Sequence, residues 1–255
     1  MTTPLADFTY EQALKRKYPS TLFLGVDEAG RGPLAGPVVA AAACYKREDY
    51  LIPEALEKQF AFIRDSKTIS EKKREEMFAL IQEHFHVGVG IIYPETIDRI
   101  NILQATFLGM KEAVGSLRRS ISQQSTINSL PESLRETLQA GQQYRHPDNG
   151  KVLLLIDGNQ KLPNISLPQE TVVSGDKIVK TIAAASIIAK VTRDRMMNEY
   201  DAKYPQYGFK KHKGYGTKVH MEALKTYGPT PIHRISFAPV AQAVLWFKEL
   251  GIIRD

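Results

Sequence analysis

The 255-residue sequence contains one cysteine, no long apolar run and no internal repeat. Cys44 cannot form an internal disulfide, and a lone thiol within small apolar residues is typical of a reducing compartment. No stretch approaches 18 uninterrupted apolar residues, so no transmembrane helix is predicted. The N-terminal segment carries acids and lacks the apolar core of a signal peptide. We therefore expect a cytoplasmic protein.

The composition excludes a chain that is disordered throughout, because 43% of the residues are hydrophobic and 24% are charged. The 17 glycines and 14 prolines follow no period, which excludes a collagen-like chain. We expect residues 1–20 to form an N-terminal extension and residues 21–255 to form one domain.

Acidic residues are absent between Ala202 and Met221, although the net charge of the whole chain is only +6. This stretch instead contains five lysines, two histidines and four aromatic residues. Cations interleaved with flat rings can contact phosphates together with sugars or bases. The alternative is a solvated, lysine-rich loop.

Apolar runs that alternate with amphipathic segments predict an α/β domain whose sheet is flanked by helices. We expect strands at 21–26, 38–45, 86–93, 151–158 and 171–173, and helices at 71–85, 100–117, 176–200 and 237–250. The short link between the first two strands predicts antiparallel pairing and hence a mixed sheet. Residues 118–150 are polar, and we interpret them as a surface excursion.

Four carboxylates lie at the ends of the predicted elements. Asp27 and Glu28 end the first strand, Asp157 ends the strand at 151–158, and Asp176 begins the helix at 176–200. Strand ends are where the active sites of α/β sheets gather, and clustered carboxylates suit Mg²⁺ or Mn²⁺. Two such ions can activate water and stabilise the leaving oxygen in phosphodiester cleavage.

Each carboxylate also has a purely structural interpretation. Asp157 precedes Gly158 as in ordinary turns, and Asp176 could cap its helix. Asp27 and Glu28 are adjacent, and neighbouring residues of a regular strand point to opposite faces. We therefore expect the chain to turn or bulge there if the two share a site.

A glycine-rich turn, Gly30-Arg31-Gly32, follows the first two carboxylates directly. Glycine lets backbone N–H groups approach a ligand closely because it has no Cβ atom. The spacing fits neither a P-loop nor a dinucleotide-binding turn.

These residues lie in a longer pattern that resembles the type 2 ribonucleases H, the ribonuclease HII family. The blocks that carry the resemblance are GVDEAGRGPLAGPVVAAA (25–42), DSKTISEKKRE (65–75), INILQAT (100–106), LLIDGN (154–159), GDKIVKTIAAASIIAKVTRDRMM (175–197), YPQYGFKKHKGYGTKVH (204–220) and HRISFAPV (233–240). The resemblance implies a ribonuclease H-like fold with a mixed central sheet and a helical C-terminal part. It also implies endonuclease cleavage of RNA in RNA–DNA hybrids and at single ribonucleotides in duplex DNA, leaving 5′-phosphate and 3′-hydroxyl ends.

By position, Asp27, Glu28, Asp157 and Asp176 resemble the four catalytic, metal-binding carboxylates of that family, with Mn²⁺ or Mg²⁺ as the cofactor. Gly30, Arg31 and Gly32 resemble its ribose-sensing turn, and Tyr215 resembles its tyrosine at the RNA–DNA junction. Ser66 and Lys67 become candidates for binding a backbone phosphate. Two residues beside the fourth carboxylate depart from the family pattern: Ser174, where a lysine is common, and Lys177, where a serine is common.

Other polar residues are interpreted structurally. Lys190, Arg193 and Asp194 are expected to form pairs on a helix surface, and His212, His220 and His233 to be loop or packing residues. His212 lies among lysines and could also contact phosphate. For Tyr215 the alternative is that the ring packs under its loop.

The leading prediction is a metal-dependent endonuclease, expected to act as a monomer on RNA–DNA hybrid and ribonucleotide-containing duplex DNA, with no membrane association. Two alternatives remain open: a non-catalytic hybrid-binding module, and a metal-dependent nuclease of other substrate choice. Convergence of the four acids would favour a nuclease over the binding module, because binding alone gains nothing from negative charge near phosphates.

Overall fold

Five strands form one mixed sheet in the computed structural model, which describes residues 6–47, 49–123 and 152–252. The strands are β1 (Leu22–Ala29), β2 (Val38–Tyr45), β3 (Phe85–Ile92), β4 (Val152–Asp157) and β5 (Gln169–Val172), in the order β3-β2-β1-β4-β5. β1 and β2 pair antiparallel, as do β2 and β3, whereas β4 and β5 run parallel to β1. The expected mixed sheet and its antiparallel first pair are confirmed.

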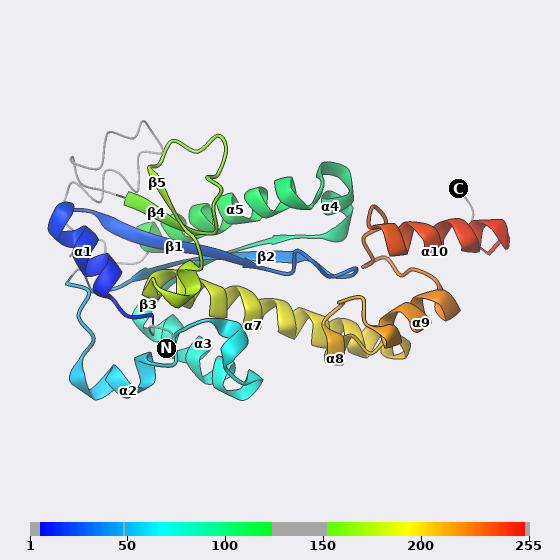
Figure 1. Ribbon diagram of the computed structural model, residues 1–255, viewed down its shortest axis with the longest axis horizontal. Coiled ribbons are helices and arrows are strands. Elements are labelled where there is room, and N and C mark those ends of the chain that lie inside the picture. The colour runs from blue at the N-terminus through cyan, green and yellow to red at the C-terminus, as the bar shows by residue number, and fades with distance from the viewer. Residues whose placement is uncertain (1–5, 48, 124–151, 253–255) are drawn as a thin grey trace.

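Two long helices cover the two faces of this sheet (Figure 1). α7 (Lys180–Lys203) packs on β1 and β2, and α5 (Ile102–Gln123) packs on β2 and β3 from the opposite side. α7 approaches the sheet closely because the buried side chains of Ala183–Ala185 are small and because Gly25, which lies beneath the helix, has no side chain. A Cβ atom on Gly25 would be 2.1 Å from the carbonyl carbon of Thr181.

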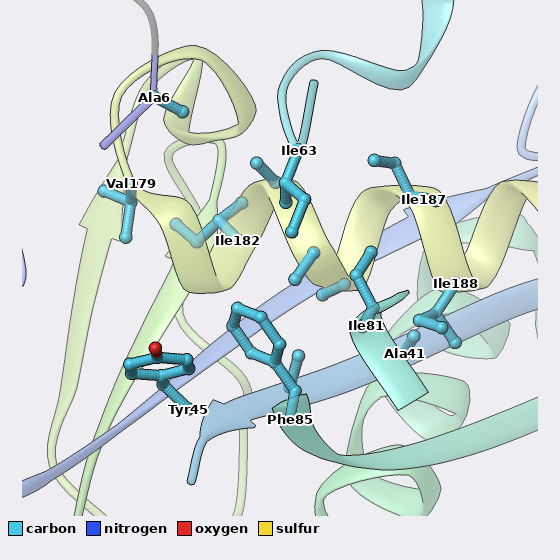
Figure 2. Packing of buried hydrophobic residues seen from close by; sticks show 14 of the residues in the cluster. Ala6, Ala41, Tyr45, Ile63, Ile81, Phe85, Val179, Ile182, Ile187 and Ile188 are labelled. Carbon is cyan, nitrogen blue, oxygen red and sulfur yellow. The ribbon is translucent and has the colours of Figure 1, made fainter. Parts of the chain in front are cut away.

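The core on the α7 side also contains aromatic residues from the first part of the chain. Phe8, just before α1 (Thr9–Lys17), has its ring centroid 4.5 Å from that of Tyr45. Figure 2 shows Tyr45 and Phe85 near Ile182 of α7, and Ile188 further along the helix near Ile81 and Ala41. Residues 6–17 thus pack into the same core as the sheet.

Shorter helices complete the two layers that cover the sheet. They are α2 (Glu57–Phe60), α3 (Glu71–His84) and α4 (Pro94–Ile100), with 3-10 turns at Glu54–Leu56 and Ser66–Thr68. Ser70 caps α3 as expected, since its side chain accepts a hydrogen bond from the N–H of Lys73 at 3.2 Å. Of the predicted polar excursion at 118–150, residues 118–123 continue α5 and the remainder lies outside the described residues.

The acid-free stretch at 202–221 is more ordered than a solvated loop. It contains a 3-10 turn at Pro205–Tyr207, α8 (Phe209–His212) and the start of α9 (Lys218–Tyr227), which precedes α10 (Ala238–Glu249). The rings of Tyr207 and Phe209 are buried and stack with their centroids 5.2 Å apart. These helices lie beyond one end of the sheet, where α10 projects from the body (Figure 1). No helix of the described residues has both the length and the apolar character needed to cross a membrane.

Candidate active site

A cavity of about 450 Å³ lies at the carboxyl ends of the parallel strands β1 and β4. Every residue that the sequence singled out as a site residue lines it: Asp27, Glu28, Gly30, Arg31, Gly32, Ser66, Lys67, Asp157, Asp176 and Tyr215. Four further residues complete the lining, namely Ala29, Ser186, Lys190 and Arg193. We refer to the four acids as the carboxylate side, and to Gly30–Gly32 together with the loop Lys213–Gly216 as the reading side.

Asp27 and Glu28 share this cavity although the strand neither turns nor bulges at them, so that expectation is wrong. Both remain in one-to-one register with β2, Asp27 opposite Ala41 and Glu28 opposite Ala40. The pairing of β1 with β4, however, ends at Val26. Side chains on both faces of β1 can therefore reach the space beyond the end of β4.

The two acids have different surroundings because they leave β1 on opposite faces. Asp27 is buried on the α7 side, where the hydroxyl of Ser186 donates a hydrogen bond to it. Glu28 also borders a smaller hollow of about 110 Å³, which Leu103 and Phe107 of α5 help to line. The carboxylate side is thus assembled around the part of β1 that extends beyond its pairing with β4.

Asp157 and Asp176 are linked through one backbone hydrogen bond. The N–H of Gly175 donates to Oδ1 of Asp157 at 2.7 Å. Asp176 lies in the 3-10 turn Gly175–Lys177 and not at the start of α7, which begins at Lys180. The predicted helix start at 176 and the capping interpretation of Asp176 are therefore wrong, and its buried carboxylate faces the cavity instead.

Three of the four acids resist ionisation. Burial raises the pKa of Asp27 well above its usual value, and the charges of Glu28 and Asp157 raise it further. Burial likewise raises the pKa of Glu28, although Arg31, whose Nη1 lies 3.3 Å from Glu28 Oε1, opposes that shift. The pKa of Asp176 rises to about 6, through burial first and then through the charges of Asp157 and Asp65.

Such mutual repulsion is what a bound cation relieves. Carboxylate oxygens are the donors that Mg²⁺ and Mn²⁺ prefer, so the donor set fits these ions. Within the described residues, no group of three His, Cys, Asp or Glu side chains is arranged to hold a metal ion as it stands.

The two glycines of the turn differ in what the fold requires of them. Gly30 has a φ of +95°, and a Cβ atom there would lie 2.1 Å from Nε of Arg193. A Cβ atom on the exposed Gly32 would meet only the ring of Tyr215, at an ordinary 3.6 Å. Packing therefore requires glycine at position 30, whereas at position 32 glycine leaves open space inside the cavity.

Two buried arginines hold the glycine turn in place. Arg234 donates to the carbonyl oxygens of Gly30, Arg31 and Gly36 at 2.6, 2.9 and 3.0 Å. Arg193 donates to Pro37 and Lys213 at 2.9 Å each, and to Ala35 at 3.1 Å. Arg193 thereby joins the segment after the turn to the loop that carries Tyr215.

The expected surface location of Arg193 is wrong, since the residue is only 1% exposed. Asp194 is also buried, but the predicted pair is present: Lys190 Nζ lies 2.7 Å from Asp194 Oδ1. The spacing of four residues along a helix predicts the pair of Lys190 and Asp194. The burial of Arg193 could not be predicted in this way, because it depends on carbonyl groups from distant segments.

Tyr215 is 46% exposed and its ring faces the cavity beside Gly32, so the ring does not pack under its loop. His212 lies behind this loop. Its Nε2 bonds to the carbonyl of Tyr207 at 2.8 Å, and its Nδ1 accepts from the N–H of Gly214 at 3.2 Å. Both ring nitrogens are therefore engaged within the protein, which leaves none for a phosphate.

Ser66 and Lys67 lie in the 3-10 turn before α3, on the cavity wall. The Ser66 hydroxyl is buried and lies 3.1 Å from that of Ser186, which itself donates to Asp27. Beside Asp176, Lys177 points toward Asp65, with 3.9 Å between Nζ and Oδ2. Ser174 has a left-handed φ of 57° and is exposed.

Two residues that contribute to the site were not predicted from the sequence. Ser186 is the only hydroxyl residue in the apolar run Ile182–Ala189 of α7, and a polar residue on a buried helix face is a usable signal. Arg234 has no comparable local signal, because its three acceptors lie about 200 positions earlier in the chain.

Comparison with known proteins gives one consistent result. Residues 24–240 match the family model described as Ribonuclease HII. The chain is 48% identical over 217 residues to the ribonuclease HII of Endomicrobium trichonymphae, which covers 85% of each chain. It is 44% identical over 237 residues to that of Acholeplasma laidlawii, covering 92% of this chain and 96% of the relative. Among solved structures, ribonuclease H2 from Pyrococcus horikoshii shares the fold, with a TM-score of 0.60 at 22% identity over 90% of this chain and 100% of that one.

Proposed function

The chain belongs to the ribonuclease HII family, and from this premise we propose that it hydrolyses the RNA strand of RNA–DNA hybrids and cuts duplex DNA at single ribonucleotides. One observation carries the proposal: four carboxylates, a glycine turn and an exposed tyrosine line a single cavity. The reaction leaves 5′-phosphate and 3′-hydroxyl ends.

Asp27, Glu28, Asp157 and Asp176 would hold the divalent ions, Mg²⁺ or Mn²⁺. The raised pKa values of Asp27, Glu28 and Asp176 support this assignment, because a buried negative charge in the cluster is costly without a cation. When bound, a pair of such ions supplies an activated water and stabilises the leaving oxygen. Ser186 holds the Asp27 carboxylate, and the N–H of Gly175 holds that of Asp157.

The reading side would recognise the substrate. At a given nucleotide the 2′-hydroxyl is the group that distinguishes RNA from DNA. The main chain of Gly30, Arg31 and Gly32 would contact it, since the space beside Gly32 is open to a ribose. Tyr215 would stack on the sugar that follows the ribonucleotide, and Lys67, beside Ser66, would contact a backbone phosphate.

The binding-module alternative is disfavoured by the same cavity. Four acids within reach of a phosphodiester would repel it, so a module that only binds hybrids would be weakened by them. Cytoplasmic location and the monomeric state stay predictions.

The test uses three labelled duplexes: DNA with one ribonucleotide, an RNA–DNA hybrid, and DNA alone. With Mg²⁺ or Mn²⁺ we expect cleavage of the first two, no cleavage of the third, and complete loss of cleavage with EDTA. Binding without cleavage would support the module instead. Comparable cutting of the all-DNA duplex would overturn the ribose-reading role of the glycine turn.

A further inference from the structure

The loop that carries Tyr215 has a backbone conformation that its own sequence does not favour. Lys213 and Gly214 follow each other with φ values of 50° and 82°, and a lysine in the left-handed region is strained. Such a conformation persists only when the surrounding structure holds it.

Three successive carbonyl groups of this loop are held by three different parts of the chain: α7, the link between β1 and β2, and α9. Arg193 Nη1 of α7 donates to Lys213 at 2.9 Å, and the N–H of Leu34 donates to Gly214 at 2.8 Å. His220 of α9 bonds through Nδ1 to the carbonyl oxygen of Tyr215 at 2.9 Å. Of the three, the bond from His220 reaches the residue whose ring faces the cavity.

The bond from His220 to Tyr215 is the last in a series of hydrogen bonds in which every donor points the same way. The N–H of Thr230 donates to Nδ1 of His233 at 2.9 Å, so a neutral His233 carries its proton on Nε2. Nε2 of His233 lies 3.0 Å from Nε2 of His220 and donates to it. The proton of His220 is then on Nδ1, where it is donated to Tyr215.

The surroundings keep both rings neutral, as this order requires. His220 and His233 are buried beneath the rings of Tyr207 and Phe209. Burial lowers the pKa of both imidazoles, that of His233 to about 3.

The same segment also reaches the glycine turn. Arg234, which follows His233 directly, donates to Gly30 and Arg31, and its N–H bonds to the carbonyl of Leu34 at 2.9 Å. One short segment, Thr230–Arg234, therefore contacts the ribose-reading turn through Arg234 and is connected to the tyrosine loop through His233 and then His220.

We propose that His220 and His233 are positioning residues for Tyr215, and that they set the preference of the enzyme for a lone ribonucleotide over continuous RNA. They act by fixing the tyrosine ring relative to the glycine turn, without touching the substrate. The inference rests on the proposed contact of Tyr215 with the sugar after the ribonucleotide.

A matched pair of substitutions at one position tests it. The side-chain amide of asparagine can place an N–H where Nδ1 of His220 lies, whereas leucine cannot donate. We measure kcat/KM on a lone-ribonucleotide duplex and on a long hybrid, and express preference as their ratio. His220→Leu should lower the ratio by about fivefold, the range expected for one lost hydrogen bond. His220→Asn should stay within about twofold of the unchanged protein, because the donor is restored.

Melting curves and Tyr215→Ala complete the experiment. Two results would show that the histidines serve only packing. In one, His220→Leu and His220→Asn shift the ratio equally; in the other, neither shifts it while Tyr215→Ala does. Either result overturns this inference and leaves the proposed function intact. If Tyr215→Ala leaves the ratio unchanged, the junction role of the tyrosine fails and the inference fails with it. A lowered ratio in His220→Leu, at a melting temperature equal to that of His220→Asn, supports positioning over general destabilisation.

Discussion

The two sides of the cavity are built in different ways. Three acids of the carboxylate side lie in strands: Asp27 and Glu28 keep the register of β1 with β2, and Asp157 ends β4. The fourth, Asp176, lies in a 3-10 turn. The reading side consists of two loops held by the buried arginines Arg193 and Arg234 from other segments and by His220 of the adjoining helix α9. In the function that we propose, strand ends place the groups for chemistry, whereas the loops determine what is recognised. The two functions should therefore be separable by mutation.

The largest effect is expected on the carboxylate side. Asp157→Asn should lower cleavage by about a thousandfold, because it removes the charge of a proposed metal ligand, worth several kcal/mol in the transition state. Binding of hybrid should persist or tighten, since one negative charge near the phosphates is gone. Single-turnover rates and a binding titration measure the two quantities. Glu75→Gln, the same change on an exposed acid paired with Arg195, is the control and should have no effect. Near-normal turnover of Asp157→Asn with Mg²⁺ or Mn²⁺ would rule out a required ligand.

The glycine turn offers a comparison within the reading side. Gly30→Ala should lower the free energy of unfolding by about 2–4 kcal/mol, because of its positive φ and the clash with Arg193. Gly32→Ala should change stability by no more than about 0.5 kcal/mol, as expected of an exposed position.

Gly32→Ala should nevertheless slow cleavage at a ribonucleotide by about tenfold, since its methyl group would occupy the space left for the ribose. Denaturant unfolding and initial rates on the same preparations measure both effects. Equal stability losses at positions 30 and 32 would contradict the conclusion that only Gly30 is required for packing. Full activity of Gly32→Ala would contradict the proposed role of the open space beside Gly32.

An effect of similar size to that of Gly32→Ala is expected at Tyr215. Stacking on an aromatic ring is worth about 1–3 kcal/mol, so Tyr215→Ala should slow cleavage at a lone ribonucleotide by about tenfold. Cleavage within a long hybrid should fall less. Tyr215→Phe keeps the ring and should retain most of the activity. Equal losses on both substrates, with a lowered melting temperature, would show that the ring serves packing.

The smallest effect concerns the metal-free protein and pH. The pKa of Asp176 is raised to about 6, so its contribution to stability is complete below its unfolded pKa of about 4 and is lost as the pH rises through 6. A divalent cation should reverse this loss where the acid is ionised. We expect Mn²⁺ to raise the melting temperature by about 2–4 °C more at pH 8 than at pH 5. Asp176→Asn should flatten the dependence, and equal shifts at both pH values would contradict it.

Much of the architecture was predictable because it rests on local signals. Continuous apolar runs predicted β1, β2 and β4, and Ser70 predicted the start of α3. The beginning of α7 was misplaced by four residues, because DKIV continues the helical pattern while the chain forms a 3-10 turn there. α1 was not foreseen, since its stability depends on packing of Phe8 and Tyr45 in the common core.

The sequence by itself determined which residue types could meet: acids at strand ends, a glycine turn after them, and a tyrosine between glycines in a basic stretch. Local chemistry and spacing are enough to place such residues on elements. Only the tertiary structure decided how Asp27 and Glu28 share one cavity, through the early end of the pairing between β1 and β4. It also decided that Arg193 and Arg234 support the reading side, because burying polar groups requires partners that lie far away in the sequence.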